Sequence, residues 1–512
     1  MESSVIVLAL ACLAALLAFI SKKTQNTKKR NPPGPKPWPI IGNLHQLPPL
    51  PHISLHLLAK KYGEIMQVKY GSGTVVVASS PKMAEEFLKT HDNVFASRPP
   101  LASGKYTGYN FQDMTWTPAG PHWRKARKVY LTEIFTPKRL NSFEYIRVEE
   151  RQRFLSGLYA KSGNPVLLKN EIRRYTLSSI SRVVLRDKYF SDHKTDTSLV
   201  SISEFHEMID EWMVLNGVIN IGDWIPWLRV FDLQGYVKRM KVLRDKFDAF
   251  HNYVIADHMA QKDLAGKNFV PKDMVDVLLQ LSEDDTDPEV KLSIEAVKAL
   301  VHDLMPGGTD TSGTTMEWAI HEILRHPDVL AKLREELDKV TNGGERWVQE
   351  DDFPQMPYLE AIIKETLRLH PLSPLLAPHF ALEDCNVAGY DIAKGTTVLI
   401  NTWSIGRHPD HWEDPYEFKP ERFLQGKEIS MTGQDFTLLP FGSGRRKCPG
   451  YTLGLRLVRT TVANIFHGFN WKLPEGMKSE DICMVERYGL TTCPEVTLSI
   501  IPEPRLPIHL YK

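Results

Sequence analysis

The chain has 512 residues, of which 42% are hydrophobic and 24% are charged, and its formal net charge is +1. This is an ordinary globular composition with ample material for a large core, and its near-neutral balance argues against nucleic acid as the main partner. The five cysteines contain no CxxC pair. That spacing argues against a disulfide framework or a structural zinc cluster and favours a reducing compartment.

The first predicted element is a membrane anchor. Val5–Ile20 carries no polar side chain and, with its flanking residues, approaches the roughly 20 residues that span a bilayer. Basic residues follow it between Lys22 and Arg30, and none precedes it, which argues against a cleaved secretory signal. By the positive-inside rule, we expect residues 1–21 to form a single transmembrane helix that leaves the rest of the chain in the cytosol.

A stiff spacer follows the predicted anchor. Five prolines occur between Pro32 and Pro39, and such a run forms neither a helix nor a central strand. We therefore expect residues 22–41 to be a basic, proline-rich hinge. Residues 42–512 contain no low-complexity linker or repeat and are predicted to be one catalytic domain.

The body of the chain is predicted to be mainly α with a small β-rich part. Alternating apolar residues around a Gly-Ser-Gly turn predict a hairpin over 64–79, and short strands are predicted at 397–400 and 495–501. Helical periodicity marks 82–89, 121–132, 199–216, 234–261, 292–324, 327–340 and 358–369.

The predicted helix 292–324 has an unusual centre. Its apolar stripe runs in register into small side chains, although Met305–Ser312 contains a proline and two glycines. In a helix interior these residues cost about 3 kcal/mol for the proline and about 1 kcal/mol for each glycine. Because the stripe resumes in register, we expect one kinked helix rather than two helices. Asp310 and Thr311 would lie at the opened point, where an acid beside a hydroxyl could relay protons.

Two further segments supply charged side chains. Glu365 and Arg368 are three residues apart on a predicted helix, so they can form a pair, and Arg422 lies in a later turn, Phe418–Phe423. An exposed pair and a buried three-way network are both compatible with this spacing.

The stretch Phe441–Gly450 places one cysteine, Cys448, among three glycines and two arginines. Glycines permit tight turns and close approach to a flat ligand, and Pro449 suits the first turn of a following helix. The helix dipole and free N–H groups there would favour a thiolate, as an axial heme ligand requires.

With these motifs the chain resembles the cytochrome P-450 family. The pattern Phe441-x-x-Gly444-x-Arg446-x-Cys448-x-Gly450 matches the family's heme-ligand signature. The run Gly307-Gly308-x-Asp310-Thr311-Ser312 is similar to its oxygen-activating groove, and Glu365-x-x-Arg368 with Phe418-x-Pro-Glu-Arg422-Phe423 is similar to its ExxR pair and partner turn. Trp123-Arg-Lys-Ala-Arg127 resembles the helix that contacts a heme propionate.

The resemblance implies the cytochrome P-450 fold and a role for each matching residue. Cys448 would be the axial thiolate ligand of heme b (iron protoporphyrin IX), and Asp310 and Thr311 would be catalytic. The other expected heme contacts are Arg446, Trp123, Arg127, His379 and Phe441. Glu365, Arg368 and Arg422 would be structural.

The activity implied is that of an NADPH- and O2-dependent monooxygenase, similar to plant A-type microsomal enzymes near the flavonoid 3'-hydroxylase-like group. Its substrate would be a lipophilic plant specialised metabolite, either a phenylpropanoid (flavonoid or lignan) or a terpenoid, hydroxylated by default. Oxidative C–C cleavage or ring formation, for example on a terpene alcohol, is an alternative, as is an O2-independent lyase or isomerase. A non-enzymatic heme carrier is a third hypothesis.

The resemblance also implies partners and a location. Electrons would come from an NADPH-cytochrome reductase, a flavoprotein, since the chain has no GxGxxG loop. The protein would be a single-pass protein of the endoplasmic reticulum membrane with its catalytic domain on the cytosolic side. By resemblance, the substrate pocket would be lined by residues 106–116, 212–213, 302–315, 373–377 and 488–491.

Overall fold

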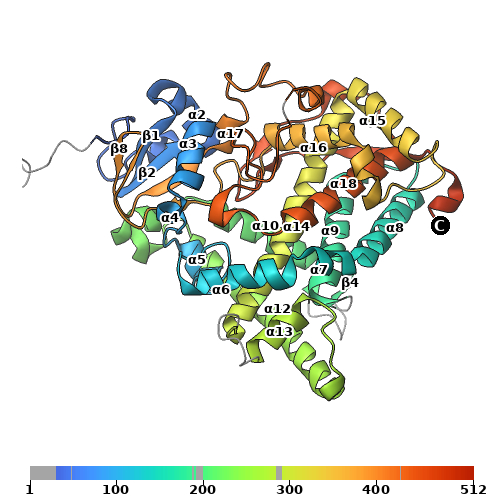
Figure 1. The fold of residues 1–512 in the computed structure, drawn as a ribbon, viewed down its shortest axis with the longest axis horizontal. Coiled ribbons are helices and arrows are strands. Elements are labelled where there is room, and N and C mark those ends of the chain that lie inside the picture. The colour runs from blue at the N-terminus through green and yellow to red at the C-terminus, as the bar shows by residue number, and fades with distance from the viewer. Residues whose placement is uncertain (1–29, 48, 187–188, 192–199, 284–290, 427) are drawn as a thin grey trace, which may run out of the picture.

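Helices dominate the computed structural model, and the strands are short, as predicted (Figure 1). The structure describes residues 30–47, 49–186, 189–191, 200–283, 291–426 and 428–512. The predicted anchor, residues 1–21, lies outside them, as do residues 22–29 of the predicted hinge. Within the described ranges, no helix is both long enough and apolar enough to cross a membrane.

The helices vary widely in length. The long ones are α8 (Glu144–Ala160), α9 (Leu168–Leu185), α10 (Ile202–Gly217), α12 (Tyr236–Ala265), α14 (Ile294–Arg325), α15 (Pro327–Val340), α16 (Pro357–Leu369) and α18 (Tyr451–Gly468). The others are α2 (Pro51–Tyr62), α3 (Pro81–Glu85), α4 (Asp92–Phe95), α5 (Ala102–Tyr106), α6 (Pro121–Val129), α7 (Pro137–Ser142), α11 (Ile221–Trp224), α13 (Met274–Glu283) and α17 (Thr402–Ile405).

The strands form one four-stranded sheet and several smaller ones. The four-stranded sheet has the order β1–β2–β9–β6, from β1 (Ile65–Tyr70), β2 (Gly73–Ala78), β6 (His379–Phe380) and β9 (Thr397–Ile400). A three-stranded sheet joins β3 (Val166–Leu167), β10 (Phe469–Lys472) and β13 (Ser499–Pro504). The remaining strands pair as β4 (Phe190–Ser191) with β5 (Val200–Ser201), β7 (Cys385–Val387) with β8 (Tyr390–Ile392), and β11 (Glu486–Arg487) with β12 (Cys493–Pro494).

The four-stranded sheet is buried on both faces. Successive side chains of β2 point to opposite faces, and each set packs in a separate apolar cluster. Val76 packs in one apolar cluster with Phe87 and Phe95, whereas Val75 packs in another with Leu55 of α2. The predicted hairpin is confirmed, with Tyr70 paired to Gly73 at its turn, and β9 has the predicted bounds.

Several predicted elements have shifted bounds in the structure, and two of these shifts have a clear local cause. The helix predicted from residue 199 begins at Ile202, because the Ser201 side chain accepts the Glu204 N–H and caps it. The strand predicted over 495–501 is wrong in its first half. Glu495 begins a bend, its N–H donates to the carbonyl of Val485, and β13 starts only at Ser499.

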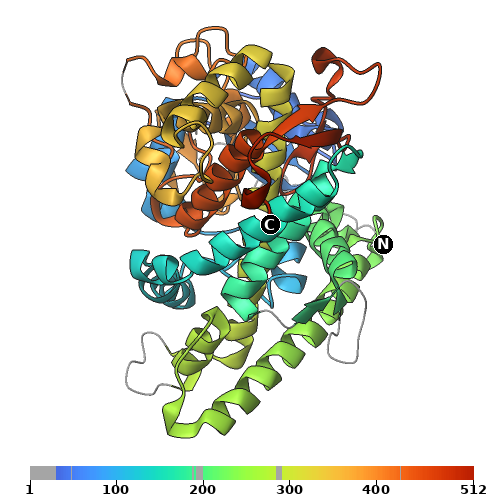
Figure 2. The ribbon, with the colours of Figure 1, turned by 90° about the vertical axis from the view of Figure 1, so that its right-hand side faces the viewer.

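Helix α14 runs through the middle of the molecule (Figure 1) and packs against α9, α13, α16 and α18. It continues without a break through Pro306, so the alternative of two helices is wrong. Gly308 permits its close approach to α9, since a Cβ there would lie 2.8 Å from Cδ1 of Ile180. The view turned by 90° shows the long α12 at the end of the molecule away from the four-stranded sheet (Figure 2).

Candidate functional site

A cavity of about 340 Å³ lies beside the central part of α14. Its wall is mostly apolar and comes from α9, α10, α14, α18 and the loops between 372 and 379 and between 440 and 450. A cavity of this size with few polar groups suits a small lipophilic ligand.

Cys448 lines this cavity and lies in a tight loop. The Cys448 N–H donates to the carbonyl of Phe441, which itself lines the cavity, at 2.9 Å. Gly444 has a φ of +66°, and a Cβ there would lie 2.2 Å from the carbonyl oxygen of Leu88, so only glycine fits. Helix α18 begins at Tyr451, which places Pro449 in the preceding turn rather than in the first helical turn that was predicted.

Opposing effects act on the pKa of the Cys448 thiol. Burial raises the pKa of the Cys448 thiol, while the N–H groups of Gly450 and Tyr451 and the positive charge of Arg127 act to lower it. The N–H donors and Arg127 thus stabilise the thiolate, but they do not fully offset the cost of burying its charge. A cation bound to the sulfur would supply the remaining stabilisation.

Three guanidinium groups, those of Arg98, Arg127 and Arg446, line the same cavity. Each donates to backbone carbonyls: Arg98 to Thr115, Ala377 and Pro378, Arg127 to Lys447, and Arg446 to Ala96, Met114 and Thr117. Among the described residues, none forms an ion pair with any of the three. Burial, with the nearby charge of Arg98, lowers the pKa of Arg446 to about 8.

Trp123 adds an unsatisfied donor to this wall. Its ring lies under the Arg446 guanidinium, 4.4 Å from the ring centroid, and its buried Nε1–H has no hydrogen-bond partner among the described residues. Three cations and a free N–H facing one cavity make a site for an anion carrying more than one charge.

His379 also lines the cavity, but as a neutral side chain. Its Nδ1 lies 2.9 Å from the carbonyl oxygen of Phe95, which can only accept, so Nδ1 carries the proton. Burial and the charge of Arg98 lower the pKa of His379 to about 3. The cation of this part of the wall is therefore Arg98, which the sequence motifs did not single out.

Thr311 and Asp310 take different positions around α14. Thr311 lines the cavity, and its hydroxyl donates to the carbonyl of Gly307 at 2.7 Å. Asp310 does not line it; its carboxylate accepts the hydroxyl of Thr491 at 2.8 Å, and Thr491 does line the cavity. Burial raises the pKa of Asp310, so the carboxyl holds a proton more readily than an exposed aspartate.

Glu365, Arg368 and Arg422 form a buried network away from the cavity wall. Arg368 donates to both carboxylate oxygens of Glu365, at 2.6 and 2.7 Å, and Arg422 donates to the same carboxylate at 3.0 Å. The Glu365 and Arg368 side chains are fully buried, so the exposed-pair alternative is wrong. Arg368 also donates to carbonyls of residues 406, 415 and 417 and thereby fastens this long loop to α16.

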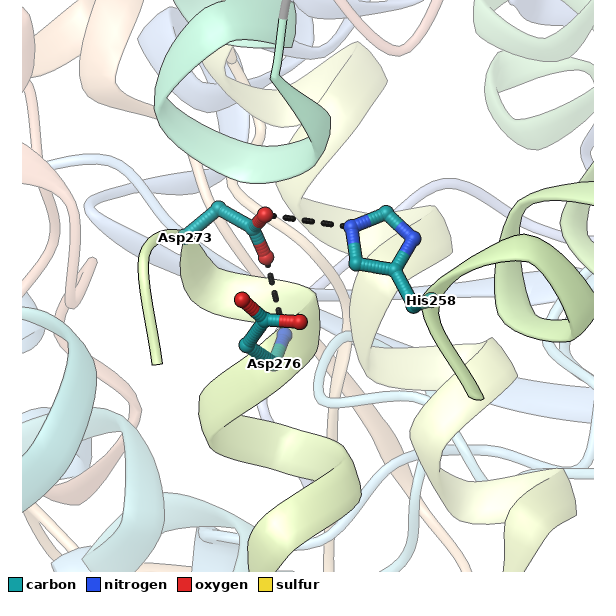
Figure 3. Close-up of side chains that lie close together, drawn as sticks. All are labelled: His258, Asp273 and Asp276. Atoms are coloured by element: carbon teal, nitrogen blue, oxygen red, sulfur yellow. Dashed lines mark hydrogen bonds and ion pairs between the residues drawn. The ribbon is translucent and has the colours of Figure 1, made fainter. Parts of the chain in front are cut away.

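One further cluster could hold a metal by its residue types. His258, Asp273 and Asp276 lie close together on α12 and at the start of α13 (Figure 3). The guanidinium of Arg186 already forms ion pairs with both carboxylates, and none of the three side chains lines the cavity. The cluster is an ion network between helices, and we assign it no metal.

The family model for cytochrome P-450 matches residues 32–496. The chain belongs to the cytochrome P-450 family. It is therefore an oxidoreductase of the monooxygenase type, and the family implies heme b held by a cysteine thiolate.

Curated relatives match over nearly the whole P-450 chain. A dimethylnonatriene synthase of Zea mays is 41% identical, with 99% of each chain covered. A flavonoid 3'-monooxygenase of Petunia hybrida is 44% identical over 94% of this chain and 93% of its own, and that of Arabidopsis thaliana is 42% identical over 99% and 98%. A zebrafish cytochrome P-450 solved with abiraterone shares the fold, with a TM-score of 0.73, 24% identity, and coverage of 89% of this chain and 100% of that one.

The cavity fits heme b. Of the four described cysteines only Cys448 lines it, and the three guanidinium groups and the Trp123 N–H match the two carboxylates of the porphyrin. Only some of the residues predicted for the pocket line the cavity. The cavity is lined by Met114, Trp212, Leu376 and Thr491, but not by Tyr106, Tyr109, His302 or Tyr488, and it includes Ile180, Val184 and Met274, which no motif marked.

Proposed function

We propose that this P-450 oxidises, and by default hydroxylates, a lipophilic plant specialised metabolite of the flavonoid or other phenylpropanoid class, or a terpenoid, with O2 and with electrons from NADPH. The observation that carries the proposal is a largely apolar cavity lined by both Cys448 and Thr311. The names of the relatives, which include flavonoid 3'-monooxygenases and a dimethylnonatriene synthase, support both substrate classes.

In this proposal heme b supplies O2 activation and transfer of one oxygen atom, and the protein supplies the surroundings. Cys448 is the iron ligand, and the N–H groups of Gly450 and Tyr451 stabilise negative charge on its sulfur. Arg98, Arg127 and Arg446, with Trp123, hold the propionates. Phe441 and His379 complete the heme-facing wall.

Protons reach the cavity through Asp310 and Thr491. The Thr491 hydroxyl bonds Asp310 Oδ2, and Thr491 lines the cavity. When the Asp310 carboxyl is protonated, this hydroxyl would accept that proton and release its own into the cavity. Thr311, one turn beyond Gly307, lines the same cavity, and its hydroxyl would add a second hydrogen-bonding group there.

The remaining parts of the proposal concern the location and the electron donor. Residues 1–21 would form a single-pass anchor in the endoplasmic reticulum membrane, residues 22–41 a hinge, and residues 42–512 a cytosolic heme domain. The electron donor would be an NADPH-cytochrome reductase. The apolar stretch Val5–Ile20 and the basic residues that follow it support this orientation.

The test is reconstitution of the full chain with heme, an NADPH-dependent reductase and a lipid membrane. Flavonoids and terpene alcohols are supplied with isotopically labelled O2, and the products are identified by mass. Gain of one labelled oxygen supports hydroxylation, whereas a shorter carbon skeleton or loss of two hydrogens identifies C–C cleavage or ring formation. Turnover of a hydroperoxide without NADPH or reductase would replace the proposal by a lyase or isomerase.

A further inference from the structure

Asp303 is the only acidic residue among the described residues that line the cavity. It lies on α14 two turns before Thr311, on the same face as Gly307. Its Oδ2 accepts the N–H of Met114 at 2.5 Å, and its Oδ1 accepts the hydroxyl of Thr115 at 3.3 Å. Burial raises the pKa of Asp303 to about 7, although the N–H groups of Met114 and Thr115 act to lower it.

The segment that Asp303 binds also holds two of the three arginines. Arg446 donates to the carbonyls of Met114 and Thr117, at 3.2 and 2.5 Å, and Arg98 donates to the carbonyl of Thr115 at 2.9 Å. Residues 113–117 therefore connect the Asp303 carboxyl on one side to two guanidinium groups on the other.

This segment has little structure of its own. Residues 113–117 belong to no helix or strand. The Trp116 N–H donates to the Asp113 side chain, the Thr117 hydroxyl bonds the carbonyls of Phe111 and Asp113, and the Asp113 N–H donates to the carbonyl of Gly108. The Trp116 indole adds one tie, to the Asn216 side chain. Asp303 binds the Met114 N–H and the Thr115 hydroxyl and thereby helps to position the carbonyls of these two residues.

We propose that Asp303 is a positioning residue for the heme: through residues 113–117 it fixes Arg98 and Arg446 against the propionates. It does not touch the heme in this proposal and acts only through these two arginines. The role differs from proton delivery, which involves Asp310: this residue lies two turns further along nearly the same face of α14 but bonds Thr491 rather than residues 113–117. It rests on heme binding at the cavity and is independent of the substrate.

The test compares heme-loaded wild type with Asp303→Asn, which keeps the side-chain shape and removes the charge. The first measurement is the rate of heme transfer to excess apomyoglobin, which we expect to rise at least threefold. The second is the propionate-bending band in the resonance Raman spectrum, which we expect to shift, because this band responds to the hydrogen bonds of the propionates. A merely structural carboxyl would leave this band unchanged.

Asp310→Asn is the matched control, since it makes the same change on the same helix but bonds Thr491 rather than residues 113–117. We expect its heme-transfer rate and Raman band to equal those of wild type. A rate and band for Asp303→Asn equal to those of Asp310→Asn would overturn the proposal.

A double-mutant cycle identifies the route of the effect. In an Arg98→Lys background, Asp303→Asn should change the heme-transfer rate by less than half of its effect in wild type, because one of its two targets is already altered. If Asp303→Asn changed the heme-transfer rate by the same factor in both backgrounds, action through Arg98 would be contradicted. If Asp303→Asn does not accumulate with heme, Thr115→Val replaces it in the same cycle, because this change removes one donor to Asp303. A smaller effect in the Arg98→Lys background would support the proposal, and an equal effect in both backgrounds would contradict it.

Discussion

The close approach of α9 and α14 gives a prediction whose size follows from the structure. In Gly308→Ala the new methyl would lie 2.8 Å from Cδ1 and 3.0 Å from Cγ1 of Ile180. Overpacking of this kind destabilises the fold by about 1–3 kcal/mol, and the better helix propensity of alanine offsets about 1 kcal/mol of this. We expect the free energy of unfolding to fall by about 0–2 kcal/mol.

The neighbouring glycine is a matched control, because a Cβ on Gly307 would have no atom within 4 Å. Gly307→Ala should therefore stabilise the protein by about 1 kcal/mol through helix propensity alone. The difference between the two variants, about 1–3 kcal/mol, isolates the steric cost against Ile180.

The assay is urea unfolding of the heme-loaded proteins followed by circular dichroism. Because Ile180 lines the cavity, Gly308→Ala should also weaken the binding of a bulky apolar ligand, measured by spectral titration. Equal stability of Gly308→Ala and Gly307→Ala would refute the reasoning, since the two helices would then have room for the methyl.

Four other predictions concern the site and its support. Cys448→Ala should abolish the thiolate-type Soret band of the reduced carbon monoxide adduct; a band that persists would show that another group is the ligand. Thr311→Ala should lower the product formed per NADPH consumed several-fold, and an unchanged ratio would remove its hydroxyl from oxygen chemistry. Arg368→Ala should destabilise the protein by about 3–5 kcal/mol, because Glu365 would remain buried with weaker compensation; a loss below 1 kcal/mol in urea unfolding would contradict this. His379 should stay neutral down to pH about 3, so its contribution to stability is full above its unfolded pKa of about 6.5 and decreases as the pH falls below that; an NMR titration near 6.5 would contradict the assignment.

The sequence predicted those elements whose signal is local. Periodicity located α14 and α15, because their apolar stripes face one core, and the Gly-Ser-Gly turn located the hairpin of β1 and β2. Cys448, Arg446 and Thr311, which the motifs singled out, all line the cavity.

The sequence could not reveal contacts between distant segments. Arg98 carries no motif, and its role depends on carbonyls of residues 115, 377 and 378. Asp303 likewise gains its partners only when residues 113–117 fold against α14. The resemblance places Tyr109 in the pocket, yet its hydroxyl bonds His251 of α12 and its ring packs near that of His302 of α14.

The pairing of β2 with β9 affects how the protein is made. Val75 pairs with Thr397, so the second strand of the sheet must wait for roughly 320 further residues to leave the ribosome. At about 5–20 residues per second this takes roughly 15–65 seconds. During that interval the apolar edge of β2 lacks its neighbour and can pair with other chains. Slower synthesis lengthens this interval and should therefore lower the yield of folded protein, whereas chaperones that cover the β2 edge should raise it.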